Sequence, residues 1–78
     1  MVKIYTSNWC GYCNAAKNLL NKLDIQFEEI NMSRQDLLNL TGEYTVPQIS
    51  INNSFIGGYQ ELQILYQNNK LEKIINGK

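Results

Sequence analysis

The two residues best suited to chemistry are Cys10 and Cys13, which are separated by two positions. Two thiols at this spacing can form a disulfide and so accept or release two electrons. We place Cys10 at the start of a helix, where free backbone N–H groups and the helix dipole favour a thiolate. The pKa of Cys10 is therefore expected to fall into the range of about 3.5–7.5 known for such sites. This arrangement predicts dithiol redox chemistry, with Cys10 as the nucleophile and Cys13 as a more buried resolving thiol.

Three alternatives to redox chemistry fit the cysteine pair less well. A structural zinc site normally requires four ligands, and the chain has two cysteines and no histidine. A structural disulfide across so short a loop would remove little entropy from the unfolded chain. A chance occurrence fits poorly with the strand–helix–strand setting of the pair. We therefore favour the redox function and predict no metal site.

The elements that must position the thiols follow from hydrophobic periodicity and from turn residues. A strand, a helix and a strand of this length imply a right-handed crossover with parallel strands. The short Asn52-Asn53 turn implies an antiparallel hairpin. The chain is thus predicted to be α/β, with order βαβαββα and a four-stranded mixed sheet flanked by three or more helices. The predicted elements are strands at 2–6, 25–30, 48–52 and 54–56, and helices at 11–23, 33–42 (capped by Ser33 and Gly42) and 59–68, with a helical turn at 71–75.

Length and charge narrow the possible partners. We expect residues 1–78 to form a single domain and a monomer. Lys plus Arg and Asp plus Glu number seven each, and no basic stripe predicts a nucleic-acid partner. The sequence also bears on the location of the protein. No apolar run approaches the length of a membrane span. Met1 leads directly into the first strand, so we expect no signal peptide. Because the only cysteines form one CxxC, we expect a cytoplasmic location.

The Val46-Pro47 bond is the only X-Pro bond in the chain. Considered alone, Pro47 would simply begin a strand after a turn. A cis bond would instead direct the backbone of Val46 outward, as an edge on which an extended peptide can pair. With a CxxC in the same chain, we favour the cis form.

Three segments carry a resemblance to a known family. Residues 10–20, CGYCNAAKNLL, resemble the CPYC-xx-AK-x-LL helix of glutaredoxins, and residues 45–49, TVPQI, and 56–59, IGGY, are similar to that family's TVPQI and IGGYD segments. The match spans nearly the whole chain in the right order. It implies the thioredoxin-like fold of a glutaredoxin of the dithiol CGYC type.

The resemblance also implies a groove that binds glutathione as a co-substrate. The cysteinyl part would pair with the backbone at 45–47, and the γ-glutamyl end would meet the N–H groups at 58–60, a helix terminus suited to a carboxylate. Tyr12 would form one wall. The implied glutathione-binding residues are Tyr12, Thr45, Val46, Pro47, Gly58, Tyr59 and Gln60.

Several charged positions of the family pattern are replaced. Ser7 stands where Lys is frequent, Glu43 and Tyr44 where Arg or Lys is common, and Gln60 where Asp receives the glutathione ammonium. Glu61 is a candidate substitute for that Asp. Charge-assisted hydrogen bonds are about twice as strong as neutral ones, so these replacements predict weaker glutathione binding.

The residues around the first thiol also depart from the pattern. Trp9 and Gly11 are similar to the WCG of thioredoxin's WCGPC. Gly11 in place of Pro removes a preset φ from the first helical turn, which should alter the redox potential. Two hypotheses for Trp9 stay open. Its side chain packs under the turn, or it forms a docking surface for a protein partner.

The leading functional hypothesis is an enzyme that uses glutathione to reduce protein disulfides or glutathionylated proteins, with no obligatory bound cofactor. A related alternative is an electron donor recharged by thioredoxin reductase, for example for ribonucleotide reductase. A third is a [2Fe–2S] carrier, a glutathione-bridged dimer that supplies four thiolates. Gly11 favours this carrier, while Trp9 and the replaced charges disfavour it. A non-catalytic interaction domain would retain its function after Cys10→Ser.

Overall fold

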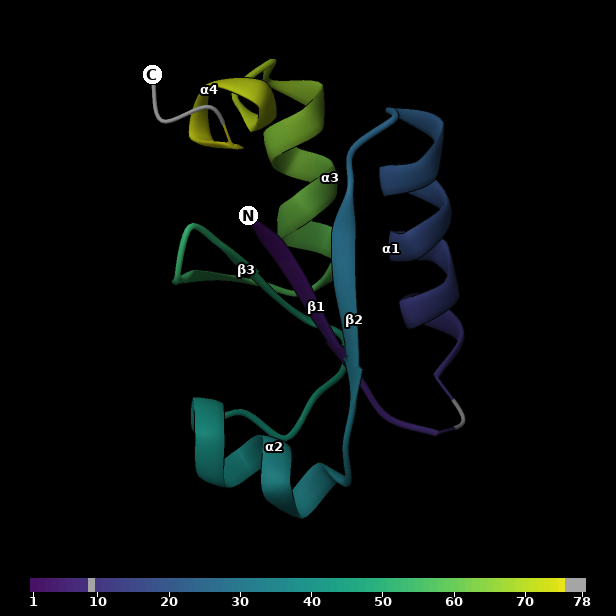
Figure 1. Cartoon of the computed structure of the whole chain (residues 1–78), viewed down its shortest axis with the longest axis vertical. Coiled ribbons are helices and arrows are strands. Elements are labelled where there is room, and N and C mark those ends of the chain that lie inside the picture. Colours follow the sequence, from purple (N-terminus) through teal and green to yellow (C-terminus); the bar gives the residue numbers. More distant parts are fainter. Residues whose placement is uncertain (9, 76–78) are drawn as a thin grey trace.

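The computed structural model describes residues 1–8 and 10–75, and its sheet has the predicted mixed topology (Figure 1). The strands are ordered β2-β1-β3-β4, with β1 parallel to β2 and antiparallel to β3, and β4 antiparallel to β3. The parallel pair requires the crossover that the first helix supplies. The strand bounds are β1 (Val2–Thr6), β2 (Phe27–Asn31), β3 (Gln48–Ile51) and β4 (Ser54–Gly57).

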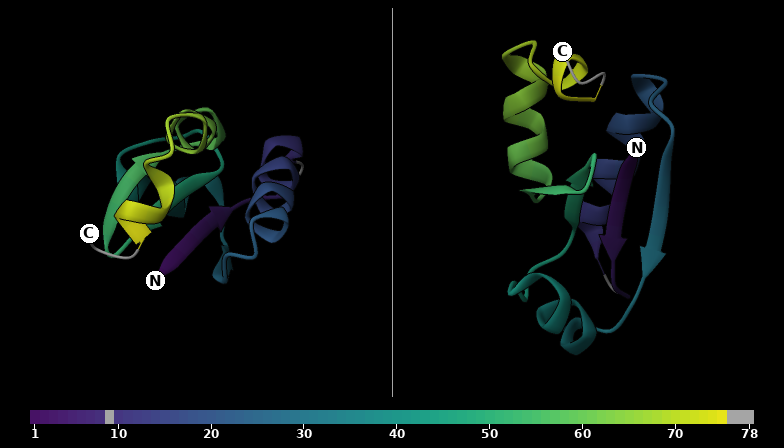
Figure 2. Two further views of the ribbon diagram at one scale, coloured as in Figure 1. Left: turned by 90° about the horizontal axis from the view of Figure 1, so that it is seen from above. Right: turned by 60° about the vertical axis from the view of Figure 1, so that its left-hand side comes forward.

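The helices are α1 (Gly11–Lys22), α2 (Arg34–Thr41), α3 (Tyr59–Gln67) and α4 (Leu71–Ile75). Helices α1 and α3 contact each other and both contribute to one buried cluster with the strands. Helix α2 lies at the end of the molecule where β1 and β2 end, and α4 lies at the opposite end (Figures 1 and 2). Within the described residues, no helix is long and apolar enough to cross a membrane.

The core lies between the sheet and the pair α1 and α3. Residues of β1 alternate between buried and half-buried, as expected for a strand with one face on the core, whereas all four residues of β3 are buried. Burial of these apolar side chains is the main favourable term in folding. The core cluster consists of Val2, Ile4, Ala16, Leu20, Ile49, Ile51, Leu62 and Leu71.

Local signals placed both ends of α2 correctly. The hydroxyl of Ser33 accepts the N–H of Asp36 at 3.1 Å, and Gly42 takes the left-handed conformation at φ 79°. Among the leucines of this helix, Leu37 is fully buried but Leu40 is 53% exposed. Leu37 is thus the one buried side chain of α2, and it lies outside the core cluster named above.

The second strand begins later than predicted. The N–H of Ile25 donates to the carbonyl of Leu20 at 2.9 Å, which closes the chain behind α1. The backbone of Ile25 is therefore used by the turn, and β2 starts at Phe27.

Candidate functional site: a disulfide at a helix start beside an acidic groove

Cys10 and Cys13 form a disulfide, with their Cα atoms 5.3 Å apart. Cys10 is the N-cap of α1, and its Sγ accepts the N–H of Cys13 at 3.0 Å. Cys13 is buried, with 3% of its surface exposed, whereas Cys10 is half-buried. Cys13 is therefore the more buried of the two residues, as predicted, and Cys10 is the more accessible residue.

The start of α1 favours negative charge on the Cys10 sulfur. The first N–H groups of a helix have no partner within the helix, and one of them already donates to Cys10 Sγ. The first turn, all of which the structure describes, contains no acidic side chain that would oppose an anion there. The two hypotheses for Trp9 lie outside the described residues and stay open.

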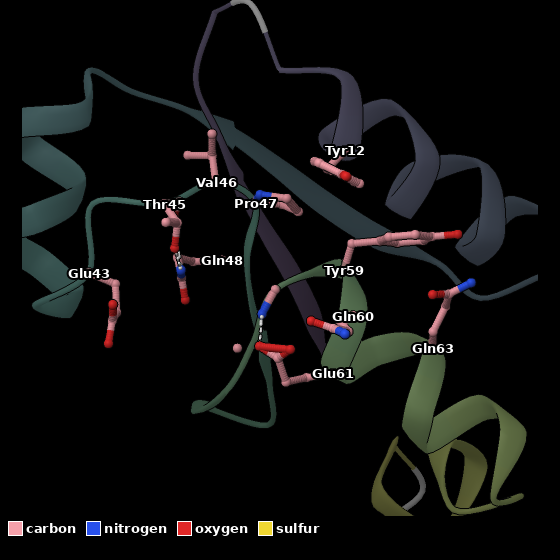
Figure 3. Close-up of a pocket in the computed structure, with 12 residues that line it drawn as sticks. Tyr12, Glu43, Thr45, Val46, Pro47, Gln48, Tyr59, Gln60, Glu61 and Gln63 are labelled. Atoms are coloured by element: carbon pink, nitrogen blue, oxygen red, sulfur yellow. Dashed lines mark hydrogen bonds between the residues drawn. The ribbon is translucent and has the colours of Figure 1, made fainter.

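A groove of about 640 Å³ lies beside this helix start (Figure 3). Its volume falls in the range of about 300–1,000 Å³ that is usual for small-molecule sites. All seven residues predicted to bind glutathione line it, and five further residues complete it. The lining residues are Tyr12, Glu43, Thr45, Val46, Pro47, Gln48, Gly57, Gly58, Tyr59, Gln60, Glu61 and Gln63.

Three segments far apart in the sequence meet in the groove. The Val46-Pro47 bond is cis, as predicted. A Cβ added to Gly58 would lie 3.1 Å from the carbonyl oxygen of Pro47, so the glycine allows α3 to begin close to this loop. Tyr12 of α1 meets Tyr59 of α3, with ring centroids 6.1 Å apart. Tyr12 thereby links the disulfide to the groove.

Gln48 also lines the groove, although the sequence predicted only that it lies in a strand. Its side chain is 5% exposed, and its Nε2 donates to the carbonyl of Thr45 at 2.9 Å and to the hydroxyl of Thr45 at 3.1 Å. These bonds hold the loop in front of β3. Its role could have been predicted from its position, because a polar side chain at the start of a buried strand requires hydrogen-bond partners.

Glu61 has a local partner that the sequence did not predict. Its Oε1 accepts the N–H of Gly58 at 3.0 Å and so caps the start of α3 (Figure 3). The side chain lies over Gly57, where an added Cβ would be 2.5 Å from Oε1. Two predicted glutathione contacts, the Gly58 N–H and the Glu61 carboxylate, are thus paired with each other.

The charged side chains among the described residues of the groove are all of one sign. Glu43 and Glu61 line it, and no Lys or Arg is among the described residues that do so. Lys17, further along α1, pairs with Glu29 at 3.1 Å. The groove is therefore acidic.

The ligands for a metal centre are few in the part of the chain that the structure describes. No group of three or more His, Cys, Asp or Glu side chains there is arranged to hold a metal ion. An iron–sulfur cluster is usually held by four thiolates, so the two thiols of one chain would need further thiolates from elsewhere.

Comparisons with known proteins agree with this geometry. The family model described as glutaredoxin matches residues 2–56. The glutaredoxin of Pseudomonas aeruginosa is 38% identical over 96% of this chain and 95% of its own length, and glutaredoxin 3 of Escherichia coli is 34% identical over 95% of both. A buckwheat glutaredoxin–glutathione complex superposes with a TM-score of 0.85 at 26% identity, covering 97% of this chain and 76% of that one.

Proposed function

Because the chain belongs to the glutaredoxin family of thiol–disulfide oxidoreductases, we propose that it reduces protein disulfides and glutathione–protein mixed disulfides through Cys10 and Cys13. The observation that carries this proposal is the unequal burial of the two cysteines at the start of α1. The half-buried Cys10 can meet a substrate, while the buried Cys13 is placed to react with Cys10.

The reaction begins from the reduced protein. The Cys10 thiolate attacks one sulfur of the substrate disulfide, which forms a mixed disulfide and expels the other sulfur as a thiolate that takes up a proton. The Cys13 thiolate then attacks Cys10 Sγ and expels the remaining substrate thiol. The Cys10–Cys13 disulfide forms, and the two electrons of the dithiol pass to the substrate. The N–H of Cys13, which donates to Cys10 Sγ, stabilises the attacking thiolate.

Glutathione is the proposed reductant of the resulting disulfide. Two glutathione molecules would supply the two electrons and leave as glutathione disulfide. The volume of the groove, and the residues that line it beside Tyr12, support binding of a tripeptide there. A neighbour of the same fold is a glutaredoxin–glutathione complex, which adds to that support.

The second candidate is a donor recharged by thioredoxin reductase. The acidic lining of the groove favours it, because Glu43 and Glu61 oppose the carboxylates of glutathione. The two candidates share the same dithiol chemistry and differ in the reductant.

Two variants and two reductants test the proposal. We expect Cys10→Ser to reduce neither a peptide disulfide nor a glutathione mixed disulfide above the rate without protein. Cys13→Ser is the matched control, which should still act on the mixed disulfide, because a second glutathione can resolve Cys10. Retained activity in Cys10→Ser would contradict the assignment. Turnover with thioredoxin reductase, and none with glutathione plus glutathione reductase, would favour the second candidate.

A further inference from the structure

The carboxylate of Glu61 is held in place at the edge of the groove. It accepts the N–H of Gly58 at 3.0 Å, and its side chain occupies the space that a Cβ on Gly57 would fill. Glu61 is itself exposed, and a carboxylate with such a bond samples fewer rotamers than an exposed glutamate without a partner. The start of α3, which would otherwise attract an anion, is already occupied by the chain's own negative charge.

Glu43 places a second carboxylate on the other side of the loop before β3. Figure 3 shows Glu43 on the side of α2 and Glu61 at the start of α3, with Thr45, Val46 and Pro47 between these two elements. A peptide paired with this loop would therefore have acidic groups near both ends. Close to the disulfide, Tyr12 is 69% exposed and offers an aromatic face, which attracts cations.

These charges match some substrates better than others. Glutathione has two carboxylates and one ammonium group, so its net charge is negative and like charges would meet at this groove. A polypeptide with Lys or Arg beside its reacting cysteine would bring opposite charges together. Complementary charge raises association rates, and like charge suppresses them.

We propose that Glu43 and Glu61 make this groove select polypeptide disulfides that have basic residues beside the reacting cysteine, over anionic small disulfides. This inference rests on the proposed thiol–disulfide exchange at Cys10 and Cys13 and adds the class of substrate. The step itself is unchanged: the protein dithiol is oxidised to the disulfide, and the peptide disulfide is reduced to two thiols. The partner segment is extended along residues 45–47 and is cationic.

The experiment compares three synthetic peptide disulfides that differ only in the residues flanking one cysteine, which are Lys, Gln or Glu. The reduced protein is mixed with each, and the second-order rate constant of disulfide reduction is measured. Each constant is divided by that for dithiothreitol with the same peptide, which removes the intrinsic reactivity of the peptide. We expect the Lys peptide to be preferred over the Glu peptide by about tenfold at low salt. Near 1 M salt, where the Debye length is about 3 Å, most of this preference should disappear.

Charge-neutral variants assign the preference to the groove. In the double variant Glu43→Gln with Glu61→Gln, the Lys-to-Glu ratio should fall to near one. The fold at the start of α3 should persist, because the introduced glutamine can still accept the Gly58 N–H through its amide oxygen. The matched control is Glu28→Gln with Glu72→Gln, which removes the same charge from exposed positions outside the groove and should keep the ratio.

The outcomes separate this inference from the proposed function. Reaction with none of the peptides would overturn the proposed function itself. Equal normalised rates for the three peptides in the unmodified protein would overturn the charge selection alone. The assignment to Glu43 and Glu61 would be overturned if the Lys-to-Glu ratio stayed unchanged in the double variant of these two residues. It would also be overturned if the ratio fell equally in the control variant.

Discussion

At the level of single residues, the groove depends on a glycine whose missing side chain makes room for an acid. Gly57 ends β4 with φ 115°, a conformation that L side chains rarely adopt. The side chain of Glu61 fills the space beside it and reaches the N–H of Gly58. The acidic cap of α3 and the shape of this end of the groove therefore depend on the same position.

Gly57→Ala tests this dependence. The added Cβ would be strained at positive φ and would displace Glu61, so we expect a loss of about 2 kcal/mol in the free energy of unfolding. Urea unfolding measures the change. Gly11→Ala is the matched control, since none of the described atoms lies within 4 Å of its added Cβ, and it should be no less stable than the unmodified protein. Equal stability of the two variants would contradict the proposed packing.

At the level of elements, the β3–β4 turn also holds the last helix. Asn52 and Asn53 form the turn, both with positive φ, a conformation that asparagine tolerates better than most residues. The side-chain nitrogen of Asn52 donates to the carbonyls of Ile74 and Ile75 at 3.0 and 3.2 Å. The last carbonyls of a helix have no hydrogen-bond donor within the helix. For α4, the side chain of Asn52 in the turn is that donor.

Replacing Asn52 by glycine keeps the turn and removes these bonds. We expect Asn52→Gly to lose about 1 kcal/mol of stability and to speed amide hydrogen exchange in α4, because the last carbonyls lose their donor. Asn53→Gly makes the same change at the neighbouring turn position, whose side chain donates to neither of these carbonyls, and it should leave exchange in α4 unchanged. Equal exchange in both variants would show that the turn does not hold the helix.

At the level of the whole molecule, α4 is part of the core although it is only five residues long. Leu71 is 3% exposed and belongs to the same buried cluster as residues of β1, α1, β3 and α3. A domain of 78 residues has a small core, and native proteins are typically stable by only about 5–15 kcal/mol. The burial of one leucine side chain therefore contributes a large share of the total free energy of unfolding.

Leu71→Ala should cost about 2–5 kcal/mol through lost burial and the cavity that remains. Ile74→Ala is the control, because Ile74 is 37% exposed and lies on the same helix, and it should cost much less. Urea unfolding monitored by circular dichroism compares the two. Similar costs for both variants would mean that α4 is not anchored through Leu71.

Much of the fold could be predicted because its signals are local. The hydrophobic periods placed the helices and strands, Ser33 and Gly42 marked the ends of α2, and the spacing of Cys10 and Cys13 indicated a redox pair. Each of these patterns acts over a few residues, so the physical cause lies within the segment that carries it. The family pattern then named seven residues that the structure brings into one groove.

The remaining features depend on how the chain packs around the groove. All four residues of β3 are buried, Gln48 among them, and its buried amide donates to Thr45. Glu61 binds the N–H of Gly58 because the backbone at Gly57 leaves room for it. Both bonds join residues three apart in the sequence, and Gly58 with Glu61 forms a capping box, which is a short local pattern. Strand pairing and the crossover decide instead that these local pairs lie in one groove with Tyr12. The cysteine pair and the acidic residues were therefore evident in the chain, whereas tertiary packing decided that these residues line one groove, because strand pairing and the crossover bring their segments together.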